Sequence, residues 1–112
     1  MLRFCPLASG SSGNSVYVGT EKTHLLVDAG LSGKRLEKAL ASCKAGMTGN
    51  LAQNLSGILV THEHTDHVRS LRAIARKMPQ IHTYANNGTW KNIKSLVEEK
   101  QREVLKREKP FS

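Results

Sequence analysis

Four residues with metal-binding side chains lie close together in the segment His62-x-His64-x-Asp66-His67. Imidazole nitrogen and carboxylate oxygen are the ligands that zinc and neighbouring divalent metals favour, at bond lengths of about 2.0–2.2 Å. The segment therefore predicts a metal site. The simpler alternative is a solvated, histidine-rich start of a helix in which Asp66 serves as the cap.

The order of these residues suits two ions. In an extended segment, residues two apart point to the same side, so His62 and His64 can bind one ion. Asp66 and His67 begin the expected helix and face a second direction, where they can bind another. Two-metal hydrolytic sites hold their ions about 3.5–4 Å apart, lower the pKa of a shared water and polarise the bond that it attacks.

The motif lies between an expected strand and an expected helix. The apolar run Ile58–Val60 predicts a buried strand that leads straight into the motif. Apolar residues then recur at helical spacing up to Pro79, which ends the helix: Val68, Leu71, Ala75 and Met78. This arrangement places the ligands at a strand end, where functional residues are common.

Two further features could contact phosphate groups, and each has a simpler reading. Arg69, Arg72 and Arg76 form a basic stripe at helical spacing, which could meet a phosphate backbone or be only a solvated helix face. The small residues of Ser9-Gly10-Ser11-Ser12-Gly13-Asn14 would let backbone N–H groups approach a phosphate, or would make a plain turn.

The rest of the chain predicts a mixed α/β fold. Strands are expected over residues 2–7, 16–18, 24–27 and 81–85, and the first three are close enough in sequence for an antiparallel meander. A helix is expected around the apolar stripe that includes Leu36 and Leu40, with Ser32 as its N-cap, and another after Asn86. Residues 44–56 are expected to be a loop, and no strand is expected after Glu98.

Composition limits the class of protein. The 112 residues carry 17 Lys and Arg against nine Asp and Glu, a net charge of +8, which favours anionic partners such as nucleic acid. No run approaches the roughly 20 apolar residues of a membrane span, and the start lacks a secretory signal. We therefore expect a cytoplasmic protein with no membrane partner, in which Cys5 and Cys43 are reduced thiols.

The segment that contains the metal motif is similar to the signature of the metallo-β-lactamase-fold hydrolases: Ile58-Leu59-Val60-Thr61-His62-Glu63-His64-Thr65-Asp66-His67. Four other segments resemble the YycJ/WalJ-type branch of that superfamily more narrowly: Leu7–Ser15, Leu26–Gly33, Tyr84–Asn86 and Thr89-Trp90. The resemblance extends from Arg3 to Trp90.

This resemblance implies an αββα sandwich, with this chain as its N-terminal half, and a hydrolase that uses two divalent metal ions, zinc or manganese. It implies that His62 and His64 bind the first ion, and that Asp66 and His67 bind the second. Asp66 would also orient or deprotonate the attacking water. Asp28 matches the family's strand-end aspartate, which supports the metal-ligand loop without touching the metal; its alternative role is a turn cap.

The family's site takes three further ligands from later in the chain: a His, a bridging Asp and another His. After His67 this sequence contains only His82 and no Asp. His82 and His24 are both expected to be structural. We therefore interpret residues 1–112 as one incomplete domain, either a fragment or a half that another chain completes. Residues 1–97 match the N-terminal half, and residues 98–112 are a charged end that could be flexible.

The implied function is a metal-dependent hydrolase, a phosphodiesterase or DNA exonuclease when full length, with DNA as its partner. Two alternatives stay open. One is an inactive truncated fragment that binds metal weakly, or binds nucleic acid without turnover. The other is a glyoxalase- or lactonase-like hydrolase of the same superfamily. A truncated half would expose an apolar sheet face and open strand edges, so self-association is expected of it.

Overall fold

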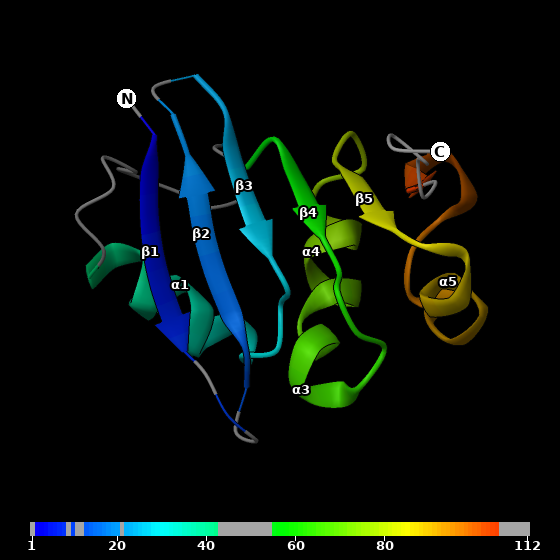
Figure 1. The fold of residues 1–112 in the computed structure, drawn as a ribbon, viewed down its shortest axis with the longest axis horizontal. Coiled ribbons are helices and arrows are strands. Elements are labelled where there is room, and N and C mark those ends of the chain that lie inside the picture. Colours follow the sequence, from blue (N-terminus) through cyan, green and yellow to red (C-terminus); the bar gives the residue numbers. More distant parts are fainter. Residues whose placement is uncertain (1, 9, 11–12, 21, 43–54, 106–112) are drawn as a thin grey trace, which may run out of the picture.

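A six-stranded mixed sheet forms the centre of the computed structural model, which describes residues 2–8, 10, 13–20, 22–42 and 55–105 (Figure 1). The strands follow one another in chain order: β1 Arg3–Ala8, β2 Ser15–Gly19, β3 His24–Val27, β4 Gly57–Leu59, β5 His82–Ala85 and β6 Arg102–Val104. The first three are antiparallel, and each later strand is parallel to the one before it. The predicted mixed fold and antiparallel meander are confirmed.

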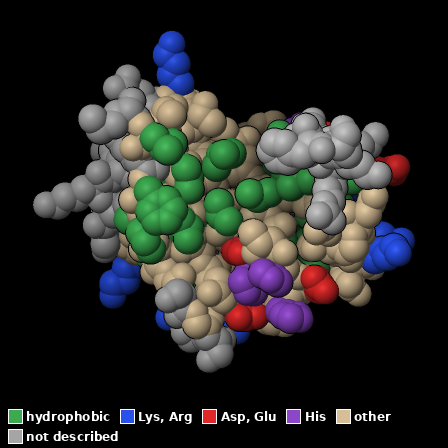
Figure 2. Space-filling model, viewed as in Figure 1, with side chains coloured by type: hydrophobic (Ala, Val, Ile, Leu, Met, Phe, Trp, Pro, Cys, Tyr) green, Lys and Arg blue, Asp and Glu red, His purple; other side chains and the backbone are tan. Residues whose placement is uncertain are grey.

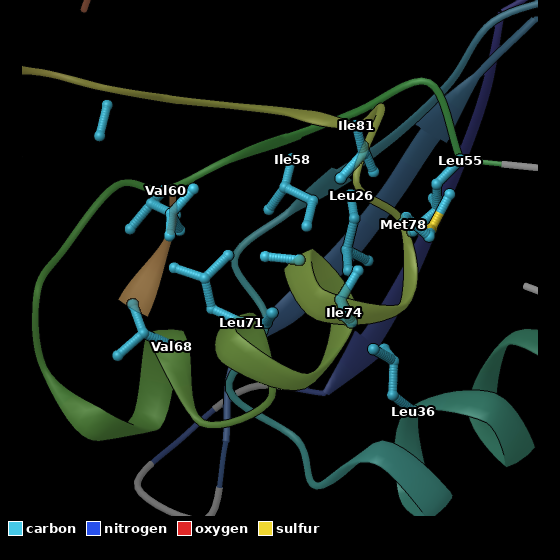
Figure 3. Packing of buried hydrophobic residues seen from close by; sticks show 14 of the residues in the cluster. Leu26, Leu36, Leu55, Ile58, Val60, Val68, Leu71, Ile74, Met78 and Ile81 are labelled. Atoms are coloured by element: carbon cyan, nitrogen blue, oxygen red, sulfur yellow. The ribbon is translucent and has the colours of Figure 1, made fainter. Parts of the chain in front are cut away.

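Helices cover one face of this sheet (Figure 1). They are α1 Gly33–Ser42, α3 Thr65–Val68, α4 Leu71–Lys77 and α5 Asn87–Ile93, followed by the 3₁₀ turns η1 Lys94–Leu96 and η2 Glu99–Gln101. Leu26 and Ile58 of the sheet are fully buried with Leu36 of α1 and Leu71 of α4 (Figure 3). Buried and half-buried residues alternate along β2 and β5, as the period of two requires.

The helix expected after the metal motif is interrupted between α3 and α4. In a continuous helix, the Ser70 N–H would donate to the carbonyl of Asp66. Instead the Asp66 carbonyl accepts from the Asn14 N–H at 2.6 Å, and the Ser70 N–H donates to the Ala29 carbonyl at 2.8 Å. The apolar residues on either side of the break are buried as predicted. At the break, hydrogen bonds to residues distant in sequence take the place of the helical hydrogen bond.

The expectation of no strand after Glu98 is wrong. Residues 102–104 form β6, which pairs in parallel with β5. Gln101 immediately before it is 2% exposed, and its side-chain amide donates to the carbonyls of Ala75, Met78 and Ile81 at 2.9–3.2 Å. The buried Gln101 amide thus satisfies carbonyls at and just after the end of α4. This contact fixes the polar segment that leads into β6.

The sheet's other face is apolar and only partly covered by described residues. Phe4, Val18 and Leu25 lie side by side across β1, β2 and β3, and Phe4 is 68% exposed. Figure 2 shows hydrophobic side chains gathered over this face. Both faces of the sheet are therefore hydrophobic, which is typical of a sheet that is packed on both sides.

The predictions about the cysteines and about membrane spans can be compared with the structure. Cys5, on β1, is disulfide-bonded, so the prediction of a reduced thiol is wrong there. Disulfide formation depends on the distance between two thiols in the folded chain, which their spacing in the sequence does not predict. Cys43 and residues 44–54 of the expected loop lie outside the described residues. Among the residues that the structure describes, no helix has the length and apolar character needed to span a bilayer.

Candidate metal centre

The motif residues lie where β4 runs into α3. His62 and His64 are exposed in the extended segment after the strand, whereas Asp66 and His67 are half-buried in α3. Figure 2 shows a cluster of histidine side chains beside acidic ones at this edge of the molecule. The boundary between strand and helix thus places two candidate ligands in the extended segment and two in the helix.

The imidazole rings converge. The ring centroids of His62 and His67 lie 4.7 Å apart, and those of His62 and His64 lie 6.3 Å apart in a stacked arrangement. One ligand atom each from Asp28, His62 and His67 lies within 4.8 Å of the others. The Nε2 of His67 is 3.7 Å from Oδ2 of Asp66. The structure therefore brings His67 next to both His62 and Asp66.

Asp28 lies beneath these rings and is 5% exposed. It directly follows β3, and its φ of 63° places it in the left-handed region, which is uncommon for a residue other than glycine. Its N–H donates to the Leu59 carbonyl at 2.7 Å, so the end of β3 is tied to β4. This unusual backbone conformation turns the carboxylate toward the metal motif, and such local strain is common at functional sites.

Protein donors occupy both oxygens of the Asp28 carboxylate. Oδ1 accepts from the Thr61 N–H at 2.7 Å, while Oδ2 accepts from the Thr61 hydroxyl at 2.5 Å and from Nδ1 of His67 at 2.8 Å. A buried carboxylate with three such bonds is well satisfied. Asp28 is therefore better placed to orient ligands than to act as one, although it belongs to the converging group.

These bonds select the tautomers of two histidines. Because Asp28 only accepts, His67 must carry its proton on Nδ1, and the Thr61 hydroxyl must give its single proton to Asp28. Nδ1 of His62, 3.0 Å from the Thr61 oxygen, then donates to that oxygen. In the neutral imidazoles, Nε2 of both His62 and His67 is then an unprotonated lone pair, which is the form that binds a metal.

Backbone bonds lock the segments that carry these side chains. The Ala29 N–H donates to the His67 carbonyl at 2.7 Å, and the Gly30 N–H donates to the Asn14 carbonyl at 2.9 Å. A side chain at Gly30 would overlap the Asp66 backbone. Glycine is needed here because the turn after β3 touches the start of the helix.

The donor set fits a divalent ion of borderline character. Two imidazoles with free Nε2 atoms and a neighbouring carboxylate are the ligands that zinc and manganese accept in hydrolytic sites. The described residues supply fewer ligands than two complete coordination shells would take, so the group formed here is a partial one.

Comparison with known proteins identifies the fold family. The sequence model described as the Metallo-beta-lactamase superfamily matches residues 8–103, which include every candidate ligand. The chain belongs to the metallo-beta-lactamase superfamily. Its structure agrees with this, since it is similar to the metallo-beta-lactamase fold protein YhfI from Bacillus subtilis with a TM-score of 0.65 at 12% identity. That match covers 97% of this chain and 46% of YhfI.

Relatives within the superfamily share much more sequence. The chain is 47% identical over 96 residues to a protein of Bacillus anthracis named exodeoxyribonuclease YycJ. It is 44% identical over 93 residues to one of Streptococcus pneumoniae named exodeoxyribonuclease WalJ. These matches cover 86% and 83% of this chain but 34% and 32% of the relatives. The chain therefore spans about a third of the length of the curated relatives that it matches, and its resemblance to the YycJ/WalJ branch is confirmed.

The other histidines of this superfamily member pair elsewhere. Nδ1 of His24 lies 2.5 Å from the Tyr17 hydroxyl, with the two rings stacked. Nδ1 of His82 lies 2.6 Å from a carboxylate oxygen of Glu103, where β5 meets β6. Both contacts suit the structural roles expected of these histidines.

In the segment between β1 and β2, the described residues use their donors within the protein. The Gly10 N–H donates to Oδ1 of Asn14, and the Gly13 N–H donates to the Gly10 carbonyl. Ser9, Ser11 and Ser12 lie outside the described residues. Phosphate binding by this segment remains a prediction.

Two contacts at the site were not expected from the sequence. Thr61 links Asp28 to His62, and the Asn14 amide donates to Asp66. Thr61 directly precedes the motif, so its position was a signal; Asn14 lies 52 residues from Asp66, and nothing along the chain connects them.

Proposed function

We propose that this chain provides the metal-binding N-terminal part of an exodeoxyribonuclease. The observation that carries the proposal is the 47% identity to the protein named exodeoxyribonuclease YycJ, over 86% of this chain. The superfamily alone includes many hydrolases, whereas this level of identity extends across the candidate site and favours a DNA substrate over a thioester or a lactone.

The site's chemistry supports hydrolysis of a phosphodiester. Two divalent ions bound here, zinc or manganese, would activate a water and neutralise the charge that develops on a phosphate. In this chain His62 and His64 would hold one ion, and Asp66 and His67 the other. Asp28 would keep the Nε2 atoms of His62 and His67 free, and Asp66 would also orient the attacking water or accept its proton.

Charge supports an anionic partner. The net charge is +8, and Arg72, Arg76 and Arg102 line a cavity of about 360 Å³ beside α4 and η1. Basic side chains supply most of the sequence-independent affinity for a phosphate backbone. We also propose a cytoplasmic location, which suits a DNA substrate, and no membrane partner.

The remaining ligands would come from outside the described residues. We propose that residues 1–112 form one incomplete domain, that residues 1–97 correspond to the N-terminal half of the αββα sandwich, and that the apolar sheet face is covered by the second half. Without that half, the same face would drive self-association of the chain.

The proposal can be tested with the protein expressed from the complete gene that encodes these residues. Linear DNA labelled at one end and a closed circle of the same sequence are incubated with the purified protein and Mn²⁺ or Zn²⁺. We expect nucleotides to be released from the linear DNA alone, and we expect chelator to stop the release. The His67→Ala variant should lose at least about 100-fold of the rate, since removing a metal ligand or its support commonly costs that much.

The control is His82→Ala, which changes a histidine outside the motif and should keep the parent rate. Cleavage of a thioester or lactone without any release from DNA would favour the glyoxalase- or lactonase-like alternative. DNA binding without release would favour a protein that holds nucleic acid but does not cleave it. Either result contradicts the proposal.

A further inference from the structure

Asn14 makes an unusual number of contacts for a half-buried residue in a turn. Its N–H donates to the Asp66 carbonyl at 2.6 Å, and its carbonyl accepts from the Gly30 N–H at 2.9 Å. Its side-chain Nδ2 donates to the Gly10 carbonyl and to Oδ2 of Asp66, both at 2.9 Å, and lies 3.3 Å from the Asp66 carbonyl. Backbone and side chain of Asn14 thus reach the same candidate ligand.

The contacts fix which way the Asn14 amide faces. Oδ1 accepts from the Gly10 N–H at 3.1 Å, a position where only an oxygen can lie. The NH₂ group is therefore directed at Asp66 and at the Gly10 carbonyl, and turning the amide over would set its oxygen against a carboxylate. The turn between β1 and β2 holds the amide in one orientation before any ligand binds.

This amide determines where the Asp66 carboxylate points. Oδ2 receives the Asn14 Nδ2–H on one side, and on another side it lies 3.7 Å from Nε2 of His67. That separation is too long for a hydrogen bond, so the two atoms face each other without being bonded. In the described part of the chain, Asn14 is the residue whose side chain holds the Asp66 carboxylate beside the free nitrogen of His67.

We propose that Asn14 is a positioning residue for Asp66, which fixes the carboxylate in the orientation that binds the second divalent ion. The inference rests on the proposed function, which assigns the second ion its role. It differs from phosphate binding by the turn, because the donors of Asn14 are already engaged with the protein. Asn14 plays for Asp66 the part that Asp28 plays for His67.

The first test compares Asn14→Ala with Asn92→Ala in the complete gene product. Asn92 is the matched control, because its amide donates to the Gly88 carbonyl within α5, away from the candidate metal centre. Titration with Zn²⁺ in a calorimeter should show that Asn14→Ala weakens the binding of one ion by about 10- to 100-fold, the usual effect of losing a residue that orients a ligand. Asn92→Ala should bind as the parent does.

Kinetics separate the two roles of the turn. If Asn14 positions Asp66, Asn14→Ala lowers kcat on linear DNA and leaves KM for DNA unchanged; if the residue contacts phosphate, KM rises instead. An unchanged Zn²⁺ affinity and an unchanged kcat would overturn the inference. A parent protein that binds neither Zn²⁺ nor Mn²⁺ would overturn the proposed function and this inference together. If the parent binds metal and releases nucleotides, any change in the variant is due to Asn14.

A second measurement uses the unmodified protein, so it does not depend on how a variant folds. The side-chain NH₂ protons of Asn14 are followed by NMR while Zn²⁺ is added. We expect them to exchange slowly with water and to shift as the ion binds, while those of Asn92 do neither. Fast exchange and no shift at Asn14 would contradict the inference.

Discussion

Asp28 has several roles at the candidate metal centre. Its carboxylate accepts from Thr61 and from His67, and through Thr61 it also sets the tautomer of His62. Its φ of 63° lets one residue end β3 and still turn toward α3. If the two histidines bind metal as proposed, their affinity would depend on a residue that need not touch the metal.

Asp28→Asn tests this dependence. Asparagine tolerates the left-handed region, so the backbone is kept. Its NH₂ group cannot accept a hydrogen bond, so either the Thr61 N–H loses its acceptor, or the Thr61 hydroxyl and Nδ1 of His67 lose theirs. We expect the affinity of the complete gene product for Zn²⁺ to fall by about 10- to 100-fold, measured by calorimetry. Affinity equal to that of the parent would show that Asp28 is only a turn residue.

Thr61 allows a finer comparison. Thr61→Val keeps the shape of the side chain and removes the hydroxyl, so Nδ1 of His62 loses its acceptor; Thr61→Ser keeps the hydroxyl. We expect about a tenfold loss of Zn²⁺ affinity in Thr61→Val and close to none in Thr61→Ser. Equal losses in both variants would point to the methyl group and contradict the tautomer argument.

At the scale of elements, the site depends on how closely the turn after β3 touches the start of α3. The Asp66 carbonyl, which would continue the helix, is used by Asn14 instead, and this ends α3 after one turn. The break separates the ligand-bearing turn from α4, which packs into the core. One set of contacts therefore positions the candidate ligands on α3, and another set buries α4.

Gly30→Ala should disturb this junction. The new methyl group would overlap the Asp66 backbone, which is itself held by Asn14. We expect the free energy of unfolding in urea to fall by at least about 2 kcal/mol, as overpacking against a fixed backbone does. Gly33→Ala is the control, since a side chain there meets no atom within 4 Å. Equal stabilities of the two variants would refute the close approach at Gly30.

For the whole molecule, the strands were more predictable than the contacts between them. The runs around Leu26 and Ile58 are apolar enough to predict β3 and β4 directly, and Asn86 was a visible cap for α5. β6 was missed because Arg102 and Glu103 make it polar, and it is held by β5 and by buried Gln101. Segments remote in sequence decide such elements.

The candidate site divides in the same way. The motif could be recognised in the sequence because its four candidate ligands lie within six positions. The strand-end position of Asp28 could be predicted from the same family resemblance. The bonds from Asn14 to Asp66 and from Asp28 to His67 connect residues 52 and 39 positions apart. Their roles follow only from the folded chain.

The apolar sheet face leads to a prediction about the whole molecule. Phe4 is 68% exposed beside Val18 and Leu25, so the 112-residue chain by itself should self-associate as its concentration rises. Phe4→Ser should reduce this association in sedimentation experiments, while Lys34→Ser, at an exposed position of α1, should not. A chain that stays monomeric at all concentrations would contradict the prediction.

The central claim is that the histidines prepared by Asp28 bind metal through their free nitrogens. Crystals of the complete gene product grown with Zn²⁺ would test it by anomalous diffraction at the zinc edge. We predict anomalous peaks beside Nε2 of His62 and beside Nε2 of His67, with Asp28 hydrogen-bonded to His67 and outside the ligand set. An absence of peaks at these nitrogens, or an ion bound directly by Asp28, would contradict the account.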